Sequence, residues 1–200
     1  MAGTHNPSDP GQLVVSQKTK IIYSVLMFVG LVAFVFTVYK SPERAWHAYL
    51  VGFFYFMSLA LGGFFFTAIQ HATKAGWSVN IRRIMESFMS FLPIGAVFAL
   101  ILMVGAPYLY EWLHAEEVAK DYLLQHKEGY LNQTFYAIRT VVFFAGWLWI
   151  GGKMVKRSLA QDESGEESLT HKNASLAVGG LVFFALSYSL FSVDALMSIE

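Results

Sequence analysis

Apolar residues along this chain fall into five blocks, each about 20 residues long, with short polar stretches between them. An α-helix of that length crosses the ~30 Å hydrocarbon core of a bilayer, whereas a soluble core would scatter its apolar residues among polar ones. The pattern therefore predicts an all-α integral membrane protein. Its expected transmembrane helices cover residues 21–39, 49–70, 85–108, 131–155 and 174–193.

The residues between the blocks predict where these helices break. Ser41-Pro42 should end the first helix, because the residue before a proline avoids helical backbone and proline has no N–H to donate. Pro93 should kink the third helix. Residues 111–130 mix charged and apolar side chains, which indicates a short amphipathic helix on the outer membrane surface. Residues 161–173 are acidic and polar and are expected to form a solvated loop.

Composition supports a membrane protein and excludes several kinds of site. Hydrophobic residues make up 56% of the chain and charged residues 14%, against roughly 25% charged in an average soluble domain. The chain has no cysteine, so it cannot form disulfides, thiolate metal sites, cysteine-ligated iron–sulfur clusters or covalent c-type haem links. The formal net charge is zero, and no basic field indicates a nucleic-acid partner.

The distribution of Lys and Arg predicts the orientation, because cytoplasmic loops carry an excess of these residues. The polar tail of residues 1–20, which we expect to be flexible, shares one side of the membrane with the second-to-third and fourth-to-fifth loops. That side holds Lys18, Lys20, Lys74, Arg82, Arg83, Lys153, Lys156, Arg157 and Lys172. The opposite side holds only Lys40, Arg44, Lys120 and Lys127. The N-terminus and the two basic loops are therefore predicted to be cytoplasmic.

Two ionisable residues at membrane depth are the first candidates for chemistry, since charge in lipid is costly. Arg139 lies about 12 Å along its helix from Leu131, and Asp194 ends the fifth helix on the same outer side. A facing pair would neutralise both charges. Asp194 would then bind a protonatable ligand such as a quinol headgroup or relay its protons. The alternative is a structural ion pair, or an Asp194 at the membrane interface in contact with water.

A second group of candidates flanks the loop between the second and third helices. It comprises His71, Arg82, Arg83 and Glu86, of which Arg82 and Glu86 are one turn apart and can pair. His71 can accept protons near neutral pH, or it can be an ordinary residue of the membrane interface. Sequence motifs for phosphate-binding loops, serine hydrolases and zinc proteases are absent from the chain.

Several strings resemble one family of membrane subunits, found in alternative complex III, the bacterial quinol:cytochrome c oxidoreductase. They follow each other in order and at family spacing between residues 46 and 200. The strings are Ser58–His71, Ala75–Glu86, Tyr130–Asn132, Ile138–Thr140, Ser158–Glu163 and Asp194–Glu200. The family is similar in turn to the polysulfide-reductase membrane subunit, which has about ten spans in two four-helix bundles. That likeness implies a peripheral helix at 21–39, a four-helix bundle at 46–200 and a chain that matches the N-terminal half of its relatives.

The resemblance also implies a function. The chain would be a membrane subunit of a respiratory quinol:cytochrome c, or oxidase-coupled, oxidoreductase in the bacterial inner membrane. It would carry no redox chemistry, no metal and no bound cofactor itself, while haem c and iron–sulfur clusters sit in partner subunits. Other subunits, lipids, a quinol such as menaquinol and a terminal oxidase would be its partners. Residues matching the family's candidates for proton transfer or quinol binding are His71, Arg82, Arg83, Glu86, Arg139 and Asp194.

A stand-alone transporter or channel is the competing interpretation. Transporters of this size are typically built from inverted repeats with paired broken helices. The sequence shows five apolar blocks and one internal proline kink, which does not match that pattern.

Overall fold

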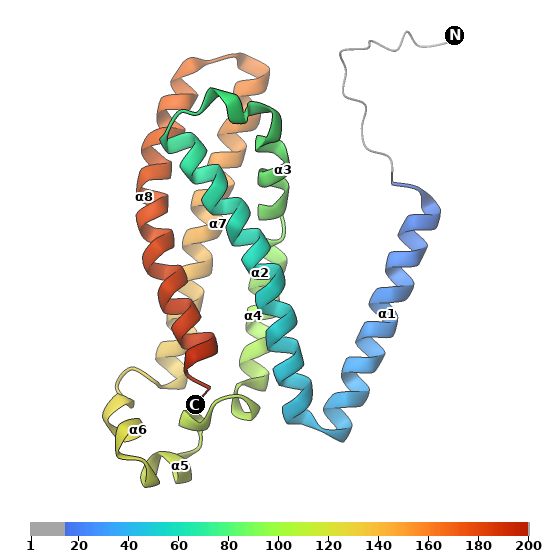
Figure 1. Cartoon of the computed structure of the whole chain (residues 1–200), viewed down its shortest axis with the longest axis vertical. Helices are drawn as coiled ribbons and strands as arrows, with labels where there is room; N and C mark the ends of the chain where they lie inside the picture. The colour runs from blue at the N-terminus through green and yellow to red at the C-terminus, as the bar shows by residue number, and fades with distance from the viewer. Residues whose placement is uncertain (1–14, 200) are drawn as a thin grey trace. The chain divides into compact units, whose positions relative to one another are not determined.

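The computed structural model describes residues 15–199, without the side chains of residues 79, 80 and 117, and all regular structure in that part is helical (Figure 1). The α-helices are α1 Gln17–Lys40, α2 Pro42–Ala72, α3 Val79–Met89, α4 Leu92–Gly105, α5 Ala115–Lys120, α6 Tyr122–Lys127, α7 Gln133–Ser164 and α8 Glu167–Ser192. Short 3-10 helices cover Gly76–Ser78, Ala106–Tyr108 and Glu111–Leu113, and a π-helical turn covers Val193–Met197.

Within residues 15–199, five helical segments are long and apolar enough to cross a membrane. They are Gln17–Lys40, Pro42–Ala72, Ile81–Tyr108, Gln133–Ser164 and Glu167–Met197. Each overlaps one of the blocks predicted from the sequence. The all-α class and the five helices of membrane-spanning length are therefore confirmed.

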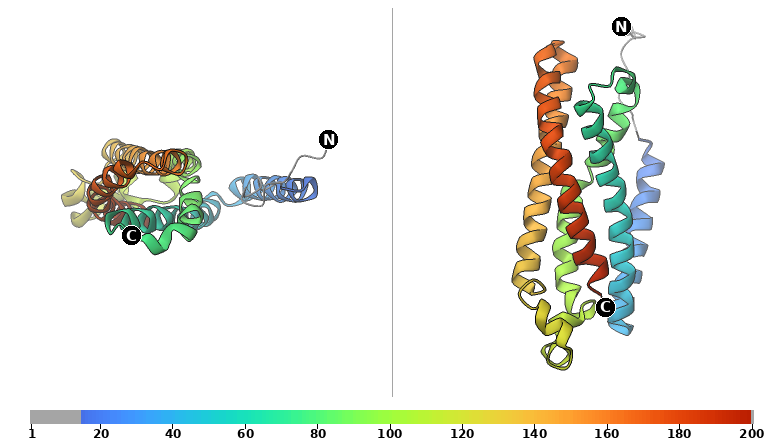
Figure 2. Two further views of the ribbon diagram at one scale, coloured as in Figure 1. Left: turned by 90° about the horizontal axis from the view of Figure 1, so that it is seen from above. Right: turned by 60° about the vertical axis from the view of Figure 1, so that its left-hand side comes forward.

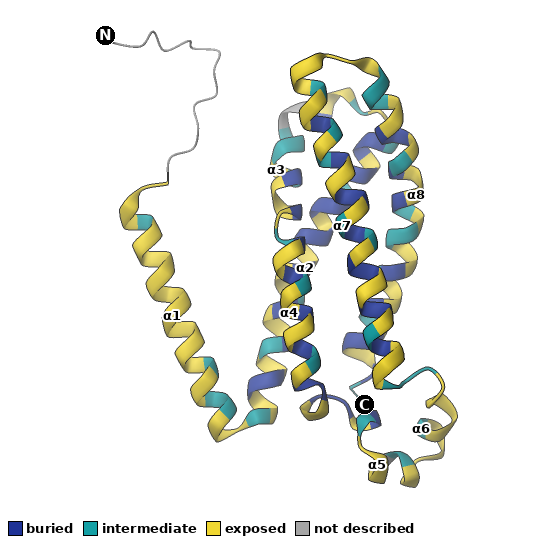
Figure 3. Ribbon diagram, turned by 180° about the vertical axis from the view of Figure 1, so that it is seen from behind, coloured by how far each residue is buried: buried dark blue, intermediate teal, exposed yellow. Residues whose placement is uncertain are grey.

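The chain forms two compact units, Met1–Ala45 and Trp46–Glu200. In the first unit, α1 has no buried residue, so its apolar side chains face outward along its whole length (Figure 3). In the second unit, α2, the α3–α4 pair, α7 and α8 lie side by side and run in alternating directions (Figures 1 and 2). Their buried residues lie on the sides that face one another. We call the described part of this second unit the helical unit.

Aromatic side chains fill the middle of the helical unit. Phe64 of α2 is fully buried and packs against α7 at Gly151, where a Cβ would lie 3.3 Å from the Phe64 ring. Trp147 of α7, also fully buried, meets Phe144 and Phe191 edge to face at centroid distances of 5.2 and 5.6 Å. The Trp147 indole N–H donates to Ser187 Oγ at 2.9 Å, which satisfies its polar group inside an apolar layer.

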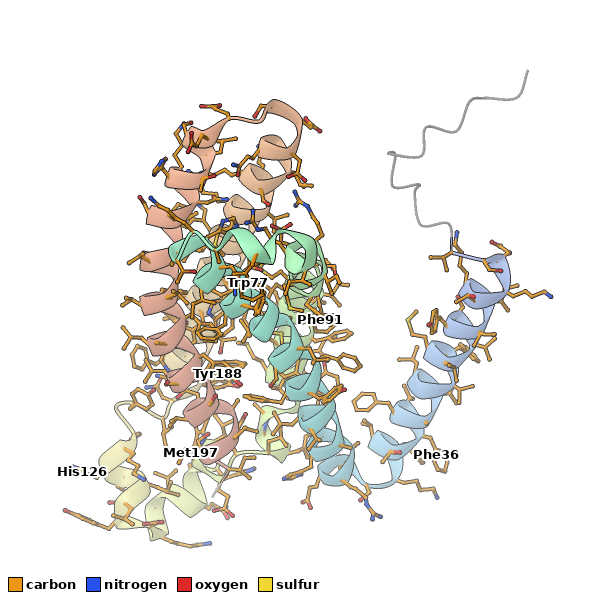
Figure 4. All side chains as sticks on the ribbon, turned by 45° about the horizontal axis from the view of Figure 1, so that its top comes forward. Phe36, Trp77, Phe91, His126, Tyr188 and Met197 are labelled. Atoms are coloured by element: carbon orange, nitrogen blue, oxygen red, sulfur yellow. The ribbon has the colours of Figure 1, made fainter. Side chains whose placement is uncertain are left out.

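The helix breaks follow the proline pattern. Ser41 has extended backbone, with φ −157°, and α2 begins at Pro42, as predicted. Pro93 occupies the first turn of α4, and the third membrane-length segment is interrupted between Met89 and Leu92. Figure 4 shows Phe91 at this interruption.

The prediction of a solvated loop over residues 161–173 was wrong. Helix α7 continues to Ser164 and α8 begins at Glu167, so the connection is only two residues long. Gly165 ends α7 with a left-handed backbone, φ +66°, which glycine adopts without steric cost. The polar residues on either side of it belong to helices that extend past the apolar blocks.

The single amphipathic helix expected over residues 111–130 is also replaced by shorter elements. Asp121 interrupts it between α5 and α6, and its carboxylate accepts a hydrogen bond from the Leu123 N–H at 2.7 Å, capping α6. Trp112 at the start of the segment is buried and stacks on Tyr110 at 5.3 Å. The segment therefore begins inside the core rather than on the surface.

Adjacent glycines in α2 offer a test of this packing. A Cβ at position 63 would lie 2.6 Å from the Met85 carbonyl oxygen and 2.8 Å from Phe88 Cβ, whereas a Cβ at position 62 would meet nothing within 4 Å. Gly63→Ala should therefore push α2 and α3 apart and lower the free energy of unfolding by about 1–3 kcal/mol. Gly62→Ala, the matched control, should leave it unchanged or raise it by up to about 1 kcal/mol. Denaturation in mild detergent, followed by circular dichroism, measures both, and equal effects would contradict the close α2–α3 contact.

Candidate functional site

Buried polar side chains gather at the two ends of the helical unit. We call them the short-loop end, with the connections at residues 73–78 and 165–166, and the long-loop end, with residues 106–132 and 193–199. The buried polar residues near the short-loop end are Thr67, Gln70, His71, Ser78, Glu86, Ser158 and Asn173, and those near the long-loop end are Arg139, Thr140, Asp194 and Ser198. From Arg139 to Ser158 the distance along α7 is about 28 Å.

An ion pair joins α7 to the end of α8 at the long-loop end. Arg139 Nε donates to Asp194 Oδ2 at 2.7 Å, and Nη2 donates to Oδ1 at 3.0 Å. The remaining terminal nitrogen of Arg139, Nη1, donates to the Tyr130 carbonyl at 3.0 Å. The two side chains are only 8% and 2% exposed. This two-pronged geometry is the strongest that arginine and a carboxylate can form.

Local structure positions both members of the pair. Asp194 lies in the π-helical turn Val193–Met197, a type of helix irregularity that often occurs at functional sites. The Arg139 guanidinium lies over two rings that meet edge to face, 3.9 Å from the centroid of Tyr130 and 4.4 Å from that of Phe135. Cation–π contacts of this kind favour the charged guanidinium in an otherwise apolar surrounding.

Tyrosines around the pair stay neutral. Burial raises the pKa of Tyr110, and neighbouring Tyr136 and the charge of Asp194 raise it further. Burial and the charge of Asp194 also raise the pKa of Tyr130. Tyr110 remains a phenol that donates to the Ala195 carbonyl at 3.2 Å. The charges of Arg139 and Asp194 therefore balance each other without a further ionised phenol.

Arg83 organises the charges at the short-loop end. It pairs with Glu86 on α3 and with Asp162 on α7, and its Nη2 donates to the Ser158 carbonyl at 3.1 Å. The expected local pair of Arg82 with Glu86 was therefore wrong. Both arginines are within one turn of Glu86, but Arg83 also reaches acceptors on α7, so it gains partners that Arg82 lacks.

Several polar atoms at the short-loop end are buried without a hydrogen-bond partner in the described part of the chain. They come from α2, α3, α7 and α8 and are Thr67 Oγ1, Gln70 Oε1, His71 Nε2, Arg82 Nε, Glu86 Oε1, Ser158 Oγ and Asn173 Oδ1. Buried polar atoms are normally paired with protein or ordered water. Trp112 Nε1 and Tyr130 Oη of the long-loop end are also without a partner among the described residues, but seven such atoms from four helices at one end are typical of a site that takes up water or a ligand.

The structure divides the six candidate residues predicted from the sequence into two separate groups. Arg139 and Asp194 meet at the long-loop end, as expected. His71 and Glu86 lie with Arg82 and Arg83 at the other end, and His71 interacts electrostatically with both arginines. What these residues do stays a prediction.

Other residues of the two groups were missed. Asp162 and Asn173 fell in the segment expected to be a loop, and Asn173 instead is fully buried, donating from Nδ2 to the Met154 carbonyl at 3.1 Å. The aromatic partners of Arg139 were not predicted either. A signal for Phe135 was available, since it lies about one helical turn before Arg139, whereas Tyr130 lies before the start of α7 and carried no such signal.

No group of three histidine, aspartate or glutamate side chains in residues 15–199 is arranged to hold a metal ion. Searches with family models and against curated proteins both found no match to this chain.

Removing one charge from the long-loop pair should be costly. Asp194→Asn leaves the Arg139 charge buried without its counter-ion, so the free energy of unfolding should fall by about 3–5 kcal/mol. Asp194→Asn with Arg139→Gln should lose less than the sum of the two single variants, because neither charge then remains unpaired. Denaturant titration in detergent measures the free energy of unfolding of Asp194→Asn, of Arg139→Gln and of the double variant. Additive losses would show that the two charges do not interact.

Proposed function

We propose that this chain is a membrane subunit, without a redox centre of its own, of a bacterial respiratory quinol:cytochrome c or oxidase-coupled oxidoreductase. We assign it a structural role and a proton half-path at its short-loop end. The observation that carries the half-path is the set of seven buried polar atoms at this end that have no partner in residues 15–199 and come from four helices. Glu86 and His71 are the titratable members of that set and would exchange the protons.

The apolar middle of the helical unit supports a half-path rather than a continuous channel. Thr67 is followed, toward the long-loop end, by the fully buried Phe64, and Trp147 and Phe191 close the next layer. An ion or a chain of waters finds few polar partners in this layer. A stand-alone channel would need a polar path across it, so this feature favours the subunit over the channel.

Membrane placement belongs to the same proposal. We place α1 as a peripheral helix, residues 46–200 as a four-helix bundle and residues 111–130 on the outer side of the bacterial inner membrane. The N-terminus and the short-loop end would face the cytoplasm, in agreement with the excess of Lys and Arg there. The family strings between Ser58 and Glu200 support the assignment to the respiratory complex.

The long-loop pair is given a structural role. Both carboxylate oxygens of Asp194 already accept hydrogen bonds from Arg139. The Asp194 side chain is also only 2% exposed, so a quinol headgroup has little access to these oxygens. The pair is therefore better suited to fastening α8 to α7 than to exchanging protons.

The identity of the complex can be tested by purification from the native membrane in mild detergent. Subunits with haem c and iron–sulfur clusters should co-purify with this chain, and mass spectrometry identifies them. A homo-oligomer free of redox subunits would contradict the proposal and favour the transporter.

The half-path can be tested in the intact complex reconstituted into vesicles. Glu86→Gln removes the titratable carboxylate, so quinol-driven proton uptake should fall by about tenfold while the complex still assembles. Glu167→Gln, an exposed carboxylate at the same end, is the matched control and should leave uptake unchanged. Normal uptake in Glu86→Gln would exclude Glu86 from the path.

A further inference from the structure

A crevice opens on the side of the helical unit between the α3–α4 pair and α7. Its cavity of about 550 Å³ falls in the size range of small-molecule sites. The space arises where α3 ends at Met89 and α4 resumes at Leu92, opposite Gly151 and Gly152 of α7, which have no side chains to fill it.

One end of the crevice is charged. Glu86, Lys156 and Glu163 line it. The Glu86 side chain is only 4% exposed, and its Oε2 binds Arg83 while Oε1 has no partner in residues 15–199. Lys156 and Glu163 lie two turns apart on one face of α7 and are both exposed. A ligand that fits this end offers an anionic group to Lys156 and a hydrogen-bond donor, preferably cationic, to the carboxylates.

The other end of the crevice is apolar and continues along α7. Leu148 lines both this cavity and a second one of about 250 Å³ between α4 and α7, where Ala99 and Ala145 are among the lining residues. From Lys156 to Ala145 the distance along the helix is about 16 Å. That distance is close to half of the ~30 Å hydrocarbon thickness, the depth that one acyl chain occupies in its leaflet.

Residues next to the charged end have the features of the membrane interface. Trp149 is 57% exposed, and Lys153 Nζ lies 4.0 Å above its ring. Tryptophan and lysine on the outer surface of a membrane helix favour the level of the lipid headgroups. Lys156 follows one turn later, so the charged end of the crevice lies at the headgroup level and the apolar end below it.

We propose that this crevice binds phosphatidylethanolamine. Its phosphate contacts Lys156, its ammonium donates to Glu86 Oε1 and Glu163, and an acyl chain runs past Leu148 toward Ala145. The headgroup chemistry selects this lipid. Phosphatidylcholine has no N–H to donate, and phosphatidylglycerol has no positive charge to balance the two carboxylates. The inference rests on the proposed membrane insertion and not on the redox partners.

Native mass spectrometry of the full chain, released from nanodiscs that contain the three lipids with identical acyl chains, tests the site. One phosphatidylethanolamine per chain should be retained, with about a tenfold preference over the other two lipids. Both test variants change exposed side chains. Glu163→Gln removes a carboxylate that distinguishes the three headgroups and should reduce this preference by about tenfold, whereas Lys156→Gln removes a phosphate contact that all three lipids share and should reduce the total lipid retained by about tenfold. Lys153→Gln, on the same surface but outside the crevice, should leave both the preference and the retention unchanged, and circular dichroism verifies the fold of each variant.

The outcomes separate this inference from the proposed function. Equal retention of the three lipids by an inserted chain would overturn the lipid site and leave the respiratory subunit untouched. Equal losses in Lys153→Gln and Lys156→Gln would overturn it as well, because they would indicate general attraction of lipid to basic residues. Failure of the chain to enter nanodiscs at all would instead overturn the membrane insertion on which both proposals depend.

Discussion

Charged side chains within long apolar helices must find their partners inside the protein, and this constraint shapes both ends of the helical unit. At the long-loop end, each of the three guanidinium nitrogens of Arg139 donates a hydrogen bond, two of them to Asp194 and one to the Tyr130 carbonyl. A buried pair with this geometry recovers much of the cost of removing both charges from water. It also fixes where α8 ends relative to α7, since Asp194 lies in the π-helical turn that closes α8.

At the short-loop end the charged and polar groups are only partly paired. Arg83 pairs with Glu86 on α3 and with Asp162 on α7, but Glu86 Oε1, Thr67 Oγ1 and His71 Nε2 have no partner among the described residues. Complete pairing holds helices in one arrangement, whereas incomplete pairing leaves binding capacity for water or a ligand. Trp112 Nε1 and Tyr130 Oη are also without a partner among the described residues of the long-loop end, so the contrast lies in the charged groups. Both oxygens of Asp194 are paired with Arg139, whereas Glu86 keeps one oxygen without a partner, and this difference is the reason for assigning a fastening role to one end and an exchange role to the other.

Sequence patterns predicted the five long helices because apolar blocks of membrane-spanning length have few other uses, and Ser41-Pro42 and Pro93 fixed two of the breaks. Membrane depth alone predicted that Arg139 and Asp194 would meet. The extension of α7 through Asp162 was missed because acidic residues suit a solvated loop and a helix equally well, and only the distant Arg83 decides between them. The same long-range contact decided which arginine pairs with Glu86, since both lie at helical spacing from it.

Glu86 links the exchange site to the lateral crevice. One of its oxygens is bound by Arg83, the other has no partner among the described residues, and the side chain lines the crevice that we assign to a phospholipid. An ammonium group at that oxygen would stabilise the ionised carboxylate and close the polar end of the helical unit against the surrounding lipid. A proton arriving at Glu86 would have to compete with this cation. Occupancy of the crevice would therefore set how readily Glu86 takes up protons, so the lipid site and the half-path are coupled through one carboxylate.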